Sequence, residues 1–197
     1  MLLPNRLFLA VLGCALTVAP ALGQATFALR NHYGGFGLDA PVYDWNGGLL
    51  TGATWRAELY GGPETGSLAP VLGLWNQQRG TAALRFPGYF HSDDEWAVFS
   101  VPVGGSAWLQ LKVWDSGLGT TYEETVAKGL GGYGQSELFY ARGGNPAGSP
   151  PDLPAPLVGL QSFSVLEVIP EPGVGVLLLA ALVVLVFAAR SRTPARR

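Results

Sequence analysis

The densest group of side chains that could do chemistry in this 197-residue chain is the run from His91 to Glu95. Its adjacent carboxylates, which include Asp93 and Asp94, repel one another, and a hard cation such as Ca²⁺ relieves that repulsion through oxygen ligands. The run lacks the spacing of a calcium loop, and the paired carboxylates of sugar hydrolysis must face each other across a substrate. Because sequence neighbours in a turn seldom do so, we interpret the run as a solvated turn between two strands.

Other catalytic and metal-binding patterns are scarce. The two histidines, His32 and His91, lie far apart in the chain, which argues against a histidine-rich metal site, and no Gly-x-Ser-x-Gly elbow of a serine hydrolase occurs. Gly129, Gly131 and Gly134 have dinucleotide-binding spacing, but phosphate binding needs a strand before the glycines and a helix after them. We interpret these glycines as a loop, and we expect a non-enzymatic protein without cofactor or metal.

Aromatic side chains are the more informative candidates for binding, since all six tryptophans lie within residues 45–114. Trp108 and Trp114 share one side of an expected strand with Gln110 and Lys112, and flat indole faces beside polar groups suit sugar rings. This pattern predicts a glycan-binding face. The alternative is a core role, because tryptophan buries a large area and the central strand of a jelly roll can bury both of its faces. We favour the core interpretation.

The periodicity of the central region predicts short strands. In residues 107–114 every second side chain is apolar, and residues 54–60 alternate in the same way. Weaker candidates are the segments 26–30, 82–86, 96–101, 137–141 and 160–168. Turns rich in glycine or proline separate these seven segments, so we expect an all-β fold, an antiparallel β-sandwich or jelly roll.

One short helix is expected after Thr121. Glu124, three residues later, completes a capping box, and Gly129 can supply the left-handed residue that ends the helix. The proline-rich stretch 146–156 has too few backbone donors for a central strand. It predicts a surface loop before the final strand.

The first 23 residues have the pattern of a secretory signal peptide. Arg6 ends a short n-region, residues 7–19 form an apolar h-region, and small residues precede a cut after Gly23. A cut before Thr26 is the alternative, and signal peptidase is therefore an expected partner. Cys14 is the only cysteine, and too few apolar residues precede it to favour lipidation. The mature domain should therefore contain no disulfide and no thiolate chemistry.

The last 28 residues carry a membrane pattern. After Pro170, Glu171 and Pro172, an uncharged apolar run occupies residues 173–189, and a basic tail follows. The tail, residues 190–197, contains Arg190, Arg192, Arg196 and Arg197. This order predicts a span of the lipid bilayer whose tail stays cytoplasmic and whose preceding domain lies outside. As a helix the 17 residues reach about 25 Å, short of a hydrocarbon core of about 30 Å, which suits a temporary segment better than a permanent anchor.

The order of the Pro-Glu-Pro motif, the apolar helix and the arginine-rich end resembles the PEP-CTERM sorting signal of Gram-negative bacteria, which the membrane protease-transferase exosortase recognises. The resemblance covers residues 170–197. It implies transit to the envelope, cleavage near Pro172 and a cell-surface or extracellular-matrix destination, and it implies no activity for the carried domain. The expected organisation is a signal peptide (1–23), an exported β-rich domain (24–169) and the sorting signal. An ordinary single-pass anchor is the alternative.

Charge divides unevenly along the chain. All 14 acidic residues lie between Asp39 and Glu171, whereas the exported stretch holds only seven basic residues. A net negative exported domain without a basic cluster argues against binding to nucleic acid or to anionic lipid. Two functions remain open: a non-enzymatic envelope or matrix protein associated with exopolysaccharide, and an exported glycan-binding or glycan-hydrolysing module on a single-pass anchor.

Overall fold

The structure, a computed structural model, describes residues 24–168. The expected signal peptide (1–23), the Pro170 to Pro172 motif, the expected membrane span (173–189) and the arginine-rich tail lie outside the described residues. Within residues 24–168 the chain is mostly β with one α-helix, which confirms the expected all-β class. No helix of this part of the chain has the length and apolar character needed to cross a membrane.

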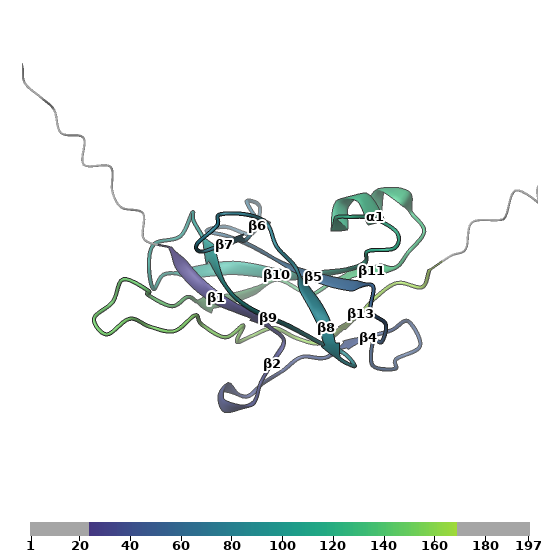
Figure 1. The fold of residues 1–197 in the computed structure, drawn as a ribbon, viewed down its shortest axis with the longest axis horizontal. Helices are drawn as coiled ribbons and strands as arrows, with labels where there is room; N and C mark the ends of the chain where they lie inside the picture. Colours follow the sequence, from purple (N-terminus) through teal and green to yellow (C-terminus); the bar gives the residue numbers. More distant parts are fainter. Residues whose placement is uncertain (1–23, 169–197) are drawn as a thin grey trace, which may run out of the picture.

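The described chain contains thirteen strands, a 3-10 helix and an α-helix (Figure 1). The first half comprises β1 (Ala25–Arg30), β2 (His32–Tyr33), η1 (Gly34–Phe36), β3 (Leu38–Asp39), β4 (Val42–Tyr43), β5 (Trp55–Gly62), β6 (Ala69–Pro70) and β7 (Leu72–Gly73). The second half comprises β8 (Ala82–Phe86), β9 (Tyr89–Val98), β10 (Ser106–Asp115), α1 (Tyr122–Lys128), β11 (Tyr133–Gln135), β12 (Phe139–Arg142) and β13 (Phe163–Ser164).

Nine of these strands form one curled antiparallel sheet. Its order is β1-β9-β8-β5-β10-β11, and β12, β6 and β7 pair with β10, β5 and β9. The curl brings β1 beside the chain that follows β12, where Thr26 and Gly144 form an isolated bridge. β2 and β3 form a small antiparallel sheet, and β4 and β13 pair in parallel. The two ends of the nine-stranded sheet are thus linked by the backbone.

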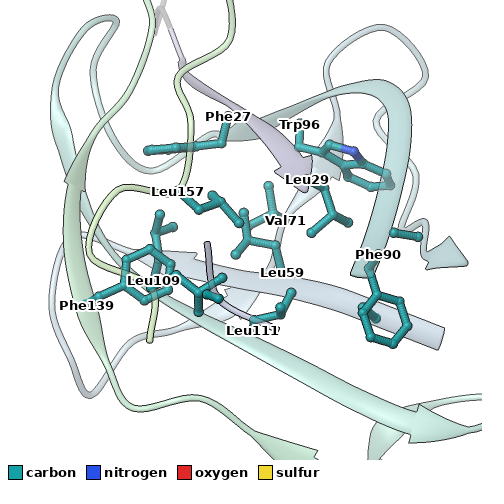
Figure 2. Packing of buried hydrophobic residues seen from close by; sticks show 14 of the residues in the cluster. Phe27, Leu29, Leu59, Val71, Phe90, Trp96, Leu109, Leu111, Phe139 and Leu157 are labelled. Atoms are coloured by element: carbon teal, nitrogen blue, oxygen red, sulfur yellow. The ribbon is translucent and has the colours of Figure 1, made fainter. Parts of the chain in front are cut away.

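The hydrophobic core lies inside the curl. On β10 the predicted alternation is confirmed, because Leu109, Leu111 and Val113 are buried while the residues between Ala107 and Val113 on the other face are half-buried. Figure 2 shows side chains of β1, β5, β10 and β12 pointing toward one another, together with Leu157 from the chain after the proline-rich stretch. Burial of these side chains replaces the disulfides that the described domain lacks.

Helix α1 has the predicted ends. The side chain of Thr121 accepts a hydrogen bond from the backbone N–H of Glu124, and Gly129 adopts a left-handed conformation with φ of 68°. The Glu124 carboxylate accepts from the backbone N–H of Thr120, at 2.7 Å, one residue before the position that a capping box uses. Figure 1 shows the helix beside β11, and it also contacts β10.

The acidic run is not a turn, so that prediction is wrong. Residues 91–95 lie within β9, which begins at Tyr89 and ends at Val98, and the expected strand 96–101 is only the end of it. The turn before β9 is at Gly88, with φ of 78°. The register with β1 shifts between Ala28 and Arg30, so residues 92–94 bulge out of the ladder. The adjacent carboxylates that suggested a turn in the sequence thus lie at and beside a bulge within a strand.

The proline-rich stretch 146–156 contains no strand, as predicted, but it is tied to the sheet. The backbone N–H of Ala155 donates to the carbonyl of Thr26, and the carbonyl of Ala155 accepts from Ala28. The expected strand 160–168 is shorter than predicted, because only Phe163 and Ser164 pair in a ladder. Their partners are Val42 and Tyr43 of β4, a strand of only two residues, so the ladder is equally short.

Replacing Leu109 by alanine should lower the free energy of unfolding by about 2–5 kcal/mol, because a fully buried leucine leaves a cavity. Leu153, which is 80% exposed, provides the matched control, and its alanine variant should change stability by less than about 0.5 kcal/mol. Urea unfolding followed by tryptophan fluorescence measures both. Equal losses in the two variants would contradict the placement of the core.

Candidate ligand-binding groove

A groove of about 670 Å³ lies at the end of the β8–β9 hairpin. Its walls combine aromatic rings with charged groups, and they come from β2, β8 and β9. Its lining includes His32, Arg85, Phe86, Tyr89, His91 and Asp93. The volume falls in the range of small-ligand sites, which are mostly apolar with a few converging polar groups. Both histidines of the chain therefore meet in one groove, which their separation in the sequence did not indicate.

One buried side chain positions the walls of this groove. The amide of Asn31, which is fully buried, donates to the carbonyl oxygens of Ala40 at 2.8 Å and Gly88 at 2.9 Å. Its own oxygen accepts from the backbone N–H of Phe90 at 2.7 Å. These bonds join the segment that carries His32 to the hairpin that carries the aromatic wall. Sequence reasoning missed Asn31, because a single asparagine at the end of an expected strand carries no distinguishing pattern.

Ionic and hydrogen-bonded pairs organise the polar side of the groove. Nε2 of His91 lies 2.7 Å from Oδ1 of Asp93, and Arg85 lies 3.8 Å from the same carboxylate. The hydrogen bond and charge of His91 lower the pKa of Asp93 below its usual value. Tyr89 donates from its hydroxyl to Asp39 at 2.8 Å, which raises the pKa of Tyr89. Asp93 therefore carries a negative charge at neutral pH.

The aromatic side of the groove is open to solvent. The rings of His32 and Tyr89 meet edge to face with centroids 5.3 Å apart, and the side chain of Phe86 is 65% exposed. Exposed aromatic faces beside hydrogen-bonding groups suit a ligand with apolar and hydroxylated surfaces, such as a sugar. Among residues 24–168 no group of three or more His, Cys, Asp or Glu side chains is placed to hold a metal ion.

A second polar cluster lies on the outer face of β5, beside α1. Glu58, whose side chain is 2% exposed, accepts two hydrogen bonds from Arg79, at 2.8 and 2.7 Å. Arg79 also donates to the hydroxyl of Tyr60 at 3.0 Å, and Tyr60 donates a short hydrogen bond to Glu123. A buried carboxylate needs such a partner, because an unpaired buried charge costs several kcal/mol. The sequence did not predict this cluster, since its members are far apart in the chain.

Lys112, on the neighbouring strand β10, packs against this cluster. Its ammonium lies 3.7 Å from the centroid of the Tyr60 ring and 4.9 Å from that of Tyr122, and burial lowers the pKa of Lys112. Burial disfavours the charged form of a tyrosine as well, so it raises the pKa of Tyr122 to about 12. Burial and the hydrogen bond to Glu123 raise the pKa of Tyr60. This part of the polar side of β10 is therefore filled by cation–π contacts rather than open to a ligand.

The two tryptophans predicted as a glycan-binding face are not presented together. Trp114 is 1% exposed, and its Nε1 donates to the carbonyl of Gly119 at 3.1 Å, so Trp114 is a core residue and cannot stack on a sugar. Trp108 is half-buried, and its ring centroid lies 5.2 Å from that of Tyr140, which is 58% exposed. Of the predicted pair, Trp108 alone borders solvent.

The glycines with dinucleotide spacing have a structural explanation. They follow α1 and lead into β11, the reverse of the order that phosphate binding requires. Gly131 has φ of 77°, and a Cβ atom there would lie 1.7 Å from the carbonyl oxygen of Glu167. A Cβ at Gly134 would lie 2.8 Å from the carbonyl oxygen of Ser164. Gly131 and Gly134 therefore permit the close approach of β13 and of the segment that follows it, whereas Gly129 ends α1.

No family model matches the chain, and neither the curated proteins nor the solved structures contain a significant match to it.

Replacing Asn31 by alanine should lower the free energy of unfolding by about 2–4 kcal/mol, because it leaves buried backbone groups without their partner. Asn46, an exposed asparagine, gives the control, and N46A should remain near the stability of the wild type. Urea denaturation measures both. A wild-type value for N31A would show that the groove does not depend on these hydrogen bonds.

Acid should destabilise the domain partly through Glu123. Partial burial opposes its ionisation, but the bond from Tyr60 and the charge of Arg79 outweigh burial and hold its pKa below the usual 4.5. The ionised carboxylate thus stabilises the fold above that pH, and the contribution is lost as the pH falls through the folded-state pKa.

Between pH 6 and pH 3, E123Q should therefore lose less stability than the wild type, by up to about 1 kcal/mol because the side chain is half exposed. Urea unfolding across this range tests the difference, with E64Q at an exposed glutamate as control. Parallel curves for wild type and E123Q would exclude the contribution.

Proposed function

We propose that this chain is an exported, non-enzymatic protein of the cell envelope or extracellular matrix, sorted by a PEP-CTERM signal and associated with exopolysaccharide. The observation that carries the proposal is the order of Pro170, Glu171 and Pro172, the apolar run 173–189 and the arginine-rich tail. The apolar pattern at residues 7–19 supports export independently.

The proposed route has three steps. Signal peptidase removes residues 1–23, the run 173–189 holds the chain in the bilayer, and Arg190, Arg192 and the terminal arginines keep the tail cytoplasmic. An exosortase-type membrane protease then cuts near Pro172 and releases the domain to the surface or the matrix. The partners are thus two processing enzymes, the bilayer and extracellular polysaccharide, with no role for nucleic acid.

We assign the carried domain to the β-sandwich or jelly-roll class. The support is the curl of the nine-stranded sheet, which places β1 and β9 across the core from β5 and β10 (Figure 2). Such a domain can present loops and outer sheet faces to a matrix while its apolar core stays buried.

The second candidate is an exported glycan-binding or glycan-hydrolysing module on a permanent single-pass anchor. The groove at the β8–β9 hairpin favours this candidate as a binder. It supports hydrolysis less well, because a general acid must stay protonated near neutral pH, whereas His91 holds Asp93 in its ionised form.

The first test is intact-mass analysis of the mature protein purified from its native cells. We expect a chain that begins at Gln24, or at Thr26, and ends near Pro172. Replacing Pro170 and Pro172 by alanine should leave the C-terminal segment attached, because the recognition motif is lost. The matched control replaces Pro154 and Pro156, which have the same spacing within the described loop, and should be processed normally.

Retention of the span and all four tail arginines in the wild-type chain would overturn the sorting proposal and leave the single-pass anchor. Equal processing of both double variants would show that cleavage does not depend on the Pro-Glu-Pro motif.

A further inference from the structure

Three hollows follow one another along β9. The groove described above is the first, and it shares Asp93 with a hollow of about 170 Å³ that Arg30 and Tyr33 also line. This second hollow shares Asp94 and Glu95 with a third, of about 120 Å³, beside the chain that links β7 to β8. Since neighbouring hollows share side chains, they form a continuous surface rather than three separate pockets.

The bulge of β9 makes this continuity possible. Residues 92–94 leave the ladder with β1, and Ser92 Oγ accepts from the backbone N–H of Asp94 at 3.2 Å. Asp93 and Asp94 are both exposed, although consecutive residues of a regular strand would point to opposite faces. The bulge therefore presents two neighbouring carboxylates to the same surface, between the first hollow and the third.

Aromatic rings stand at the two ends. The exposed Phe86 and the half-buried Tyr89 line the first hollow, and Trp75, which is 82% exposed, lines the third. The loop that carries Trp75 is tied to β9, because the backbone N–H of Leu74 donates to the carbonyl of Glu95 at 2.8 Å. A large apolar ring is thus held at the surface by a fixed backbone contact.

The middle of the surface is polar. Carboxylates of Asp93, Asp94 and Glu95 line it, and the guanidinium of Arg30 lies over the ring of Tyr33, 4.9 Å from its centroid. Carboxylates and a guanidinium together provide both acceptors and donors for hydroxyl groups. The surface therefore alternates between a ring that can stack and groups that hydrogen-bond.

We propose that this surface, the β9 track, binds a neutral oligosaccharide chain that stacks on Tyr89 at one end and on Trp75 at the other. From Tyr89 to Glu95 the strand advances about 13 Å, because the bulge sets four residue steps of β9 against two of β1, so the occupant must be longer than a single sugar. The three carboxylates in the middle and the negative charge of the domain repel acidic polymers. The track rests on the polysaccharide association proposed above and specifies its site and its ligand class.

The test is calorimetric titration of the full-length chain in detergent micelles. The probes are cellohexaose, maltohexaose, mannohexaose and chitohexaose, each with its disaccharide, and a hexamer of galacturonic acid as the acidic comparator. We expect at least one neutral hexamer to bind at least tenfold more tightly than its disaccharide and than the acidic hexamer. W75A and Y89A should each weaken that binding at least tenfold.

Trp45 gives the matched control, because it is an exposed tryptophan, 46% accessible, that lines none of the three hollows. W45A should bind as the wild type does. Binding by no neutral hexamer, preference for the acidic hexamer, or equal affinity for disaccharide and hexamer would overturn the track. A loss in W108A with none in W75A would also overturn it, by moving the ligand to the β10–β12 face.

The outcome is separable from that of the sorting proposal. Absence of binding by a chain whose C-terminal segment is still removed in its native cells would reject the track alone. If a chain that keeps residues 173–189 in its native cells still binds the hexamer, the sorting proposal alone is rejected. The β9 track would then belong to a membrane-anchored domain.

Discussion

The three hydrogen bonds of Asn31 are the interaction on which the candidate site depends. They bind the end of β1 to the segment before β4 and to the β8–β9 hairpin, whose residues lie 57 and 59 positions away in the chain. Since the side chain is fully buried, each bond satisfies a group that could not turn to water instead. His32 follows Asn31 directly, and Tyr89 lies between its two partners on the hairpin. One amide thus sets the relative position of the two walls.

Local patterns in the sequence predicted the fold well where both partners of an interaction are close in the chain. The alternation on β10 and the cap at Thr121 depend on neighbours within a few residues, and both were confirmed. The error at residues 91–95 has the opposite origin. Three acids in succession are typical of a solvated turn, yet here the ladder with β1 continues on either side, and within the bulge Asp93 and Asp94 are exposed while Ser92 is buried. A long-range pairing overrode the local composition.

The site was predicted less well, for a related reason. His32 and His91 appeared unrelated in the sequence and share one groove, whereas Trp108 and Trp114 appeared paired and have different surroundings. The alternating pattern of the sequence correctly put both tryptophans on one side of β10. It could not show that Trp114 is buried against the chain at Gly119 while Trp108 packs against the exposed Tyr140. The cluster around Glu58 likewise joins β5, the chain before β8 and α1, and only the curl of the sheet brings these segments together.

The isolated bridge between Thr26 and Gly144 has a further consequence, for how copies of the domain meet one another. The outer side of β1 is hydrogen-bonded to Gly144 and Ala155, and the segment after β13 bonds to β11 through Leu166. A sheet that leaves its last strand unpaired offers a template for a second chain and invites aggregation. Here short stretches of irregular backbone occupy both positions. At these two edges, copies crowded together at high concentration find backbone hydrogen-bonding groups already engaged, which favours contact through side chains.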